Sequence, residues 1–162
     1  VRTLGTPMDG KYKWLRGNLH PDGSIYCIPC HAPTILRIDC TASPPVISEM
    51  GGPHPGKWKW HGGVLSPHDL CICSIPQFAE TVLKIDPQTQ TTSEIGGPFP
   101  GASPTGKHKW YGGLLGGDGC IYGQRPGRNR RTTRWRVWRC MHPLPLLSCP
   151  VRCHLHRCTA MR

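Results

Sequence analysis

The sequence predicts an all-β protein built from repeated four-stranded antiparallel sheets. A block of about fifty residues occurs nearly three times, opening at Gly10, Gly56 and Gly106 with spacings of 46 and 50 residues. Within each copy the apolar residues form short runs that Gly, Pro, Asp or Asn interrupt, which is the pattern of strands and tight turns. A repeat of this length is one unit that buries its apolar face only against a neighbouring copy. The chain is therefore expected to fold as an array.

Four strands are expected in each copy. In the first copy they lie around Asn18-Leu19, from Ser24 to Ile28, from Thr34 to Asp39 and from Val46 to Met50. Pro21-Asp22-Gly23 joins the first two strands, since proline fixes one turn position and glycine accepts a positive φ at the next. A helical repeat would need about ten residues free of Gly and Pro, and the longest candidate, 78–86, is short and β-branched. We therefore predict an incomplete β-propeller of two four-stranded blades and the start of a third.

The three copies align residue by residue and define the organisation of the chain. The matched positions are Trp14, Trp60 and Trp110, then Gly17, Gly63 and Gly113, and then Leu19, Leu65 and Leu115. Asp22-Gly23 matches Asp118-Gly119, and we align His68-Asp69 of the second copy with them, with one extra residue, Leu70. We expect an N-terminal remnant at 1–9, repeats at 10–55 and 56–105, the start of a repeat at 106–123, and an Arg- and Cys-rich tail at 124–162.

The repeat carries a family resemblance. The pattern W-x-G-G-x-L-x-P-D-G-x-I-Y-x-I-P, followed by V-L-K-I-D-P-x-T, resembles β-propeller repeats of the group that includes NHL-type, virginiamycin B lyase-like and gluconolactonase-like proteins. Gly62-Gly63 and Gly112-Gly113 are more distantly similar to kelch repeats, although the Tyr and Trp at kelch spacing are missing. The resemblance covers 10–123 and implies the architecture. It implies no single activity, because propellers host unrelated functions.

Charge divides the chain near Gly123. Residues 124–162 contain ten arginines, no lysine and no acidic residue, whereas residues 1–123 are nearly neutral. This tail lacks periodicity, and its composition is typical of a GC-rich coding region read out of frame. We expect a largely irregular, disordered segment or the product of a gene-model error, and we interpret the chain as a fragment.

The tail offers two candidate sites, and we expect neither to function. Arginines from Arg125 to Arg139, interleaved with Trp135 and Trp138, have the composition of a nucleic-acid-binding segment, but basic tails are more often simply solvated. The second candidate is a cluster of zinc-type ligands. It comprises Cys149, Cys153, His154, His156 and Cys158. Its spacing is not that of paired zinc knuckles.

The cysteines of the repeats replace ordinary strand side chains. Cys27-x-x-Cys30 has no second pair opposite it, and Cys71, Cys73 and Cys120 align with strand residues of the first copy. We expect buried, reduced thiols and no cofactor. The sequence shows no signal-peptide pattern and no apolar run long enough to span a membrane, so a cytoplasmic location is the default.

The acidic residues that recur between copies are expected to support the scaffold rather than catalysis. They are Asp39 with Asp86, Glu49 with Glu94, and Asp22 with Asp118. A catalytic group usually occurs once, whereas a scaffold group occurs in every copy. The histidines His20, His61, His68 and His108 have no matched partners. We therefore assign no catalytic residue and expect a binding or scaffold module; the alternative is a fragment of a propeller enzyme of the lactonase or lyase class.

The motif Lys-x-Lys-Trp is the most distinctive surface signal of the repeat. Its members are Lys11, Lys13, Trp14, Lys57, Lys59, Trp60, Lys107, Lys109 and Trp110. Strand-like alternation would place both lysines of a copy on one face. Such a stripe could meet an anionic partner, but we favour tryptophans that pack between blades and lysines that protect the surface. The expected partner is a protein or another copy of the chain, bound through the open blade edges.

Overall fold

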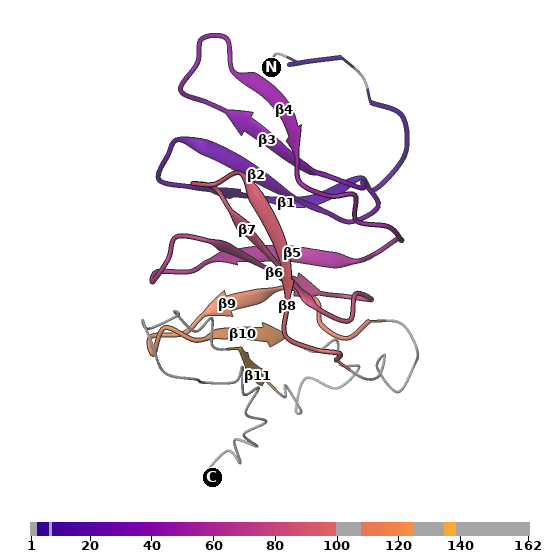
Figure 1. Ribbon diagram of the computed structural model, residues 1–162, viewed down its shortest axis with the longest axis vertical. Helices are drawn as coiled ribbons and strands as arrows, with labels where there is room; N and C mark the ends of the chain where they lie inside the picture. Colours follow the sequence, from indigo (N-terminus) through magenta and orange to yellow (C-terminus); the bar gives the residue numbers. More distant parts are fainter. Residues whose placement is uncertain (1–2, 7, 100–107, 125–134, 139–162) are drawn as a thin grey trace.

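The computed structural model describes residues 3–6, 8–99, 108–124 and 135–138. Three antiparallel sheets account for its regular structure, and no helix occurs in these ranges. The sheets follow one another along the chain as three layers (Figure 1). The described residues accordingly contain no helix long and apolar enough to cross a membrane.

Two of the sheets have four strands each, in sequential order. Sheet 1 comprises β1 (Trp14–Leu19), β2 (Ser24–Pro29), β3 (Ile35–Asp39) and β4 (Val46–Met50). Sheet 2 comprises β5 (Trp60–Leu65), β6 (Ile72–Pro76), β7 (Val82–Asp86) and β8 (Thr91–Ile95). Sheet 3 has the order β11-β10-β9 and comprises β9 (Gly113–Leu115), β10 (Ile121–Gln124) and β11 (Trp135–Trp138). The expected four-stranded sheets are therefore confirmed for the first two repeats.

The structure differs from the sequence prediction in part of the tail. Trp135–Trp138 form β11, which pairs with β10 from Gln124 to Ile121. The prediction of an irregular tail with few contacts therefore does not hold at these four residues. The zinc-type cluster expected between Cys149 and Cys158 lies outside the described residues.

The turn between the first two strands of each sheet uses the same aspartate. Asp22 Oδ1 accepts a hydrogen bond of 2.8 Å from the amide of Ser24, and Asp69 Oδ1 accepts one of 3.2 Å from the amide of Cys71. The residue after the aspartate has a positive φ in both turns, 83° at Gly23 and 55° at Leu70. Leu70 thus occupies the glycine position. The alignment that made Leu70 the extra residue is wrong; the extra residue of the second copy precedes Asp69.

The first strand of each of the first two repeats contains an irregularity that the sequence did not indicate. The register of β1 with β2 shifts between Trp14 and Gly17, and that of β5 with β6 shifts between Trp60 and Gly63. The strands therefore begin at the tryptophan, earlier than expected. Inside this bulge one residue takes a left-handed conformation: φ is 62° at Arg16 and 73° at Gly62. A bulge leaves one residue unpaired and redirects its side chain.

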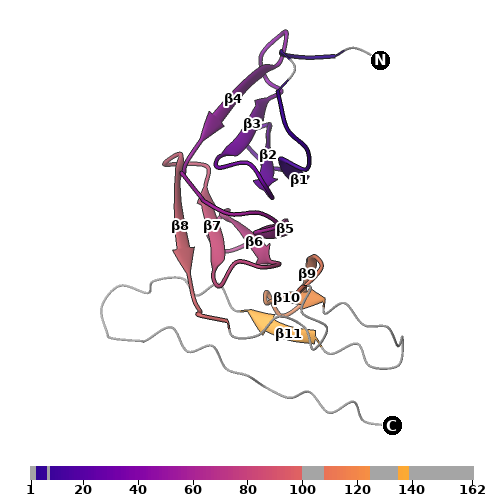
Figure 2. The same cartoon turned by 90° about the vertical axis from the view of Figure 1, so that its right-hand side faces the viewer.

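Sheets 1 and 2 share one apolar core. Its buried members are Tyr26, Ile28, Ile35, Trp60, Ile72, Leu83 and Ile85. Trp60 is 1% exposed, so its expected position at the junction of the two sheets is confirmed. The opposite face of sheet 2 packs with Trp110, which precedes β9, and with Ile121 of β10. Figure 2 shows β1, β5 and β9 along one side of the stack and β4 and β8 along the other.

Glycine recurs in the first strands because the sheets approach one another closely there. A Cβ at Gly63 would lie 2.9 Å from Ile72 Cγ2 and 3.0 Å from Ile28 Cδ1 of sheet 1. At Gly113 the added atom would lie 2.7 Å from Ile75 Cδ1 of sheet 2. All three distances are shorter than ordinary van der Waals contact. The side chains of β1, β5 and β9 are consequently brought within reach of one another.

Candidate functional site

The second lysine of the Lys-x-Lys-Trp motif joins consecutive sheets. Lys59 Nζ donates hydrogen bonds to the carbonyl oxygens of Cys30 (3.0 Å), Ala32 (2.9 Å) and Gly56 (3.1 Å). The side chain thus uses the three donors of an ammonium group. Burial lowers the pKa of Lys59. Lys109 repeats the arrangement, donating to Phe78 O at 3.2 Å and Ala79 O at 3.0 Å.

These contacts correct the expected surface stripe at two of its lysines. Lys59 is 4% exposed and Lys109 is 7% exposed, whereas Lys11 and Lys57 are exposed. Alternation fails because the residue between the two lysines leaves the strand conformation: φ is 55° at Tyr12 and 53° at Trp58. Lys107 lies outside the described residues. The motif is therefore mainly a connector between sheets.

The tryptophans of the motif are held in the same way in the first two repeats. Trp14 Nε1 donates to Thr34 O and Trp60 Nε1 donates to Thr81 O, each at 2.8 Å. Trp60 and Trp110 are buried, while Trp14 is half-buried. In both of these repeats the indole N–H thus donates to a carbonyl of its own repeat, which satisfies its polar group.

Lys13 is the corresponding lysine of the first repeat, and it lacks a carbonyl cradle. Its Nζ lies 4.8 Å from the centroid of the Trp14 ring, and it makes no hydrogen bond to the side chains or carbonyls of the described residues. The surrounding face of sheet 1, here called the open face, is half-buried or exposed. It consists of Trp14, Leu19, Ile25, Leu36 and Ile38. The equivalent residues Ile72, Leu83 and Ile85 of sheet 2 are 0% exposed.

The recurring acids bind neighbouring groups of the scaffold. Asp39 Oδ1 accepts hydrogen bonds from Thr41, and Asp86 Oδ1 accepts from the amides of Gln88 (2.9 Å) and Thr89 (3.2 Å). Glu49 and Glu94 accept hydrogen bonds from the hydroxyls of Thr34 and Thr81 respectively. In the part of the chain that the structure describes, no group of His, Cys, Asp and Glu is arranged to hold a metal ion.

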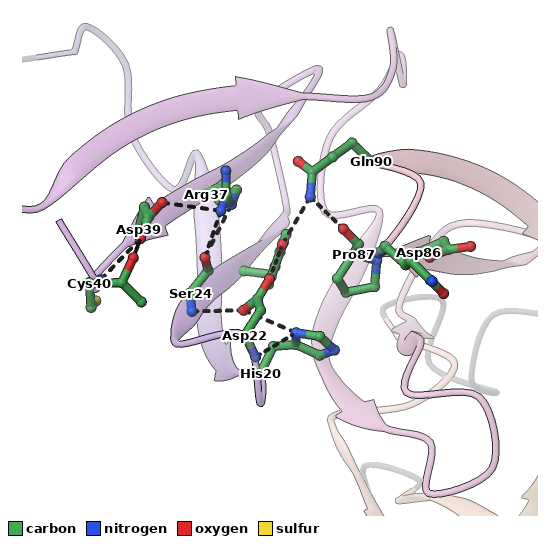
Figure 3. Close-up of polar contacts among 12 residues, drawn as sticks. His20, Asp22, Ser24, Arg37, Asp39, Cys40, Asp86, Pro87 and Gln90 are labelled. Atoms are coloured by element: carbon green, nitrogen blue, oxygen red, sulfur yellow. Dashed lines mark hydrogen bonds and ion pairs between the residues drawn. The ribbon is translucent and has the colours of Figure 1, made fainter.

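Asp22 also takes part in a contact between sheets 1 and 2 (Figure 3). Its Oδ2 accepts a hydrogen bond of 2.8 Å from the Tyr26 hydroxyl, and that hydroxyl accepts one of 3.1 Å from Gln90 Nε2 in the β7–β8 turn. Asp118 and Tyr122 repeat the first of these bonds at 2.8 Å. This network gives the recurring aspartate of the turn a structural role.

A different set of residues, absent from the sequence prediction, meets at the first strands. Arg16 of sheet 1, His61 of sheet 2 and Tyr111, which precedes β9, occupy the bulge or the residue before it. The Tyr111 ring stacks on the His61 ring at 3.8 Å between centroids and 30° between planes. His61 is 7% exposed, and its Nδ1 makes no hydrogen bond to another described residue. Burial, then Arg16, then His108 lower the pKa of His61.

The signal that could have located this cluster lies in the differences between copies. The position of Arg16 is glycine in the other repeats, Gly62 and Gly112, and the position of His61 is Leu15 and Tyr111. The residues that the copies share belong to the scaffold, so similarity between copies does not identify this cluster. The four unmatched histidines include His61, but only the structure brings it to Arg16.

The cysteines follow the expectation in part. Cys27, Cys30 and Cys71 are free thiols that are buried or half-buried, whereas the free thiol Cys40 is exposed. Burial raises the pKa of Cys71 to about 11, which keeps it protonated at neutral pH. Cys73, in contrast, is disulfide-bonded.

Comparisons with protein-family models, with curated proteins and with solved structures find no significant match to this chain. Function is therefore inferred from the contacts of the repeats themselves.

Proposed function

We propose that the chain is a β-propeller-type repeat module that acts as a binding scaffold and assembles through the open face of sheet 1. The resemblance to NHL, lyase-like and gluconolactonase-like repeats supports the propeller assignment. The stacking of antiparallel sheets with β1, β5 and β9 on one side (Figure 2) is compatible with blades arranged about an axis. Sheet 1 is then a blade that packs against sheet 2 on one face, while no other described sheet covers its open face.

One observation carries the proposal: the open face has the same chemistry as the face by which sheet 2 binds sheet 1. Leu36 and Ile38 correspond to Leu83 and Ile85, which are 0% exposed in the shared core. Lys13 corresponds to Lys59, which needs carbonyl oxygens of a preceding repeat. Apolar area of this kind favours association when it is removed from water. The occupant is thus another copy of the repeat, supplied by a second copy of this chain.

In the proposed propeller, β1, β5 and β9 are the inner strands, and the enzyme alternative requires acids, amides or histidines that converge there. Among the described residues, Arg16, His61 and Tyr111 lie there. The recurring carboxylates instead accept hydrogen bonds within turns and between strands. No observation favours a lactonase or lyase over a binding module, so the binding module is the function we propose.

Sedimentation velocity of the full chain over a range of concentrations tests this proposal. Leu36→Asp puts a carboxylate on the open face, and we expect the dissociation constant to rise about a hundredfold or more because the charge is buried without a partner. Val46→Asp is the matched control: Val46 is 54% exposed at the start of β4, so its substitution should leave association intact. Circular dichroism of both variants serves as the control that their β-sheet content is unchanged. A chain that stays monomeric, or that associates equally in both variants, contradicts the proposal.

A further inference from the structure

Arg16 adopts a left-handed backbone conformation, and the equivalent positions of the other two repeats are glycine. Its φ is 62°, against 73° at Gly62 and 87° at Gly112. A residue with a Cβ is disfavoured in this region, and such strain is often retained at functional positions. The arginine therefore stands where the fold alone would prefer glycine.

The Arg16 side chain crosses from sheet 1 over Gly62 of β5 and toward Gly112, which precedes β9. A Cβ at Gly62 would lie 3.0 Å from Arg16 Cδ, and a Cβ at Gly112 would lie 3.7 Å from Arg16 Nη1. Glycine at both positions leaves room for the arginine. The guanidinium group is consequently directed along the inner strands and reaches sheet 3.

His61 brings a second nitrogen to the same point. Its Nδ1 lies 4.0 Å from the position that a Cβ at Gly112 would occupy, so Nδ1 and Arg16 Nη1 flank one location. His61 is more than nine-tenths buried, and this nitrogen has no hydrogen-bond partner on another described residue. A buried polar atom without a partner is costly. The Tyr111 ring covers one face of the imidazole while remaining 50% exposed itself.

Arg16 forms no ion pair with a carboxylate of the described residues. The ion pairs of those residues involve Asp22, Asp39, Asp69 and Glu94. The effect of Arg16 and His108 on His61, whose pKa they lower further after burial, has the sign expected of a positive local potential. His108 is itself bound at Nδ1 by Gln77 Nε2 at 2.6 Å.

We propose that Arg16, His61 and Tyr111 form a binding site for a small oxyanion of the carboxylate or phosphate type. The guanidinium group donates to the anionic oxygens, the His61 nitrogen donates a further hydrogen bond, and Tyr111 shields one side from water. Arginine is suited to this role because its planar donors match both carboxylate and phosphate. The site lies on the inner strands, away from the open face, and it does not depend on association of the chain.

Titration of the full chain with sodium phosphate and, separately, with sodium acetate tests the site. Ionic strength is held constant with chloride, and the histidine side-chain resonances are followed by NMR. We expect the His61 signals to shift and to saturate with at least one anion. Saturation with phosphate alone or acetate alone identifies the preferred chemistry. A signal that does not saturate with either anion overturns the proposal.

Arg16→Gly is the decisive variant because it gives the first repeat the residue found in the other two. It should fold at least as well as the natural chain, while anion affinity falls about tenfold or more through loss of a charge-assisted hydrogen bond. His61→Gln should weaken binding in the same direction. Lys57→Gln removes one exposed positive charge elsewhere and should leave affinity unchanged. Equal losses in Arg16→Gly and Lys57→Gln would mean general charge attraction and would refute the site.

Discussion

Lys59 Nζ lies 3.0 Å from the carbonyl oxygen of Cys30, and this hydrogen bond joins the second repeat to the first. The lysine comes from the segment before β5, and the carbonyl follows β2. A buried ammonium group is stable only when its donors are satisfied. Sheets 1 and 2 are thus joined by hydrogen bonds from Lys59 and by the shared apolar core around Trp60.

Lys59→Met should destabilise the chain by about 2 kcal/mol. Methionine keeps the length and apolar stem of lysine but leaves the carbonyls of Cys30, Ala32 and Gly56 without this donor, and a buried acceptor without a partner costs about 1–3 kcal/mol. Lys57→Met changes an exposed neighbour and should stay within about 0.5 kcal/mol. Urea unfolding followed by tryptophan fluorescence compares the two. Equal effects would mean that the carbonyl cradle contributes nothing to stability.

Asp69 should make the chain less stable in acid. Burial opposes ionisation of Asp69, but hydrogen bonds from Lys84, Ser66 and the Cys71 amide outweigh it and lower its pKa from 3.8 to about 2. Because the folded pKa is below the unfolded one, the stabilisation is present above pH 3.8 and is lost as the pH falls toward 2. Lys84 Nζ lies 2.8 Å from Asp69 Oδ2. Thermal unfolding between these pH values measures the effect. The melting temperature should depend less steeply on pH for Asp69→Asn than for Asp9→Asn, which changes an exposed carboxyl group.

Local turn chemistry and repeat matching were sufficient to predict most strands. Ser24 begins β2 and Val46–Met50 forms β4 as expected, because glycine, proline and aspartate mark the turns on either side. Trp60 could be placed at a junction because each repeat must bury its apolar face against another. These features depend on short stretches of sequence or on the similarity of the copies.

The burial of Lys59 and the Arg16–His61 cluster could not be predicted in this way. Trp58 has a positive φ, which its residue type does not signal, so the alternation that placed Lys59 on the surface was misleading. Arg16 and His61 are 45 residues apart in the chain and meet only because the bulges of β1 and β5 lie side by side. Their proximity is a property of sheet packing.

Gly63→Ala should destabilise the chain by about 1–3 kcal/mol, the usual cost of adding a group to a packed core. The new methyl group would lie 2.9 Å from Ile72 Cγ2 and 3.0 Å from Ile28 Cδ1, so these two buried side chains, or the strands that carry them, would have to shift. Gly117→Ala provides the control, because a Cβ there meets nothing within 4 Å. Denaturant unfolding measures both. Alanine restricts the unfolded chain and by itself favours folding, so a loss at Gly117 as large as that at Gly63 would contradict close packing as the cause.

Leu70→Gly should stabilise the chain slightly, by about 0.5 kcal/mol. Leu70 has a φ of 55° and is 45% exposed, so little packing is lost when its side chain is removed. Relief of the left-handed conformation is worth about 1–2 kcal/mol, and the greater freedom of glycine in the unfolded chain takes back about 0.5–1 kcal/mol. The converse change, Gly23→Ala, should destabilise by about 1 kcal/mol or more, since φ is 83° and alanine cannot adopt it without strain. Differential scanning calorimetry should show a higher melting temperature for Leu70→Gly and a lower one for Gly23→Ala. A lower melting temperature for Leu70→Gly would contradict the assignment of Leu70 to the glycine position of the turn.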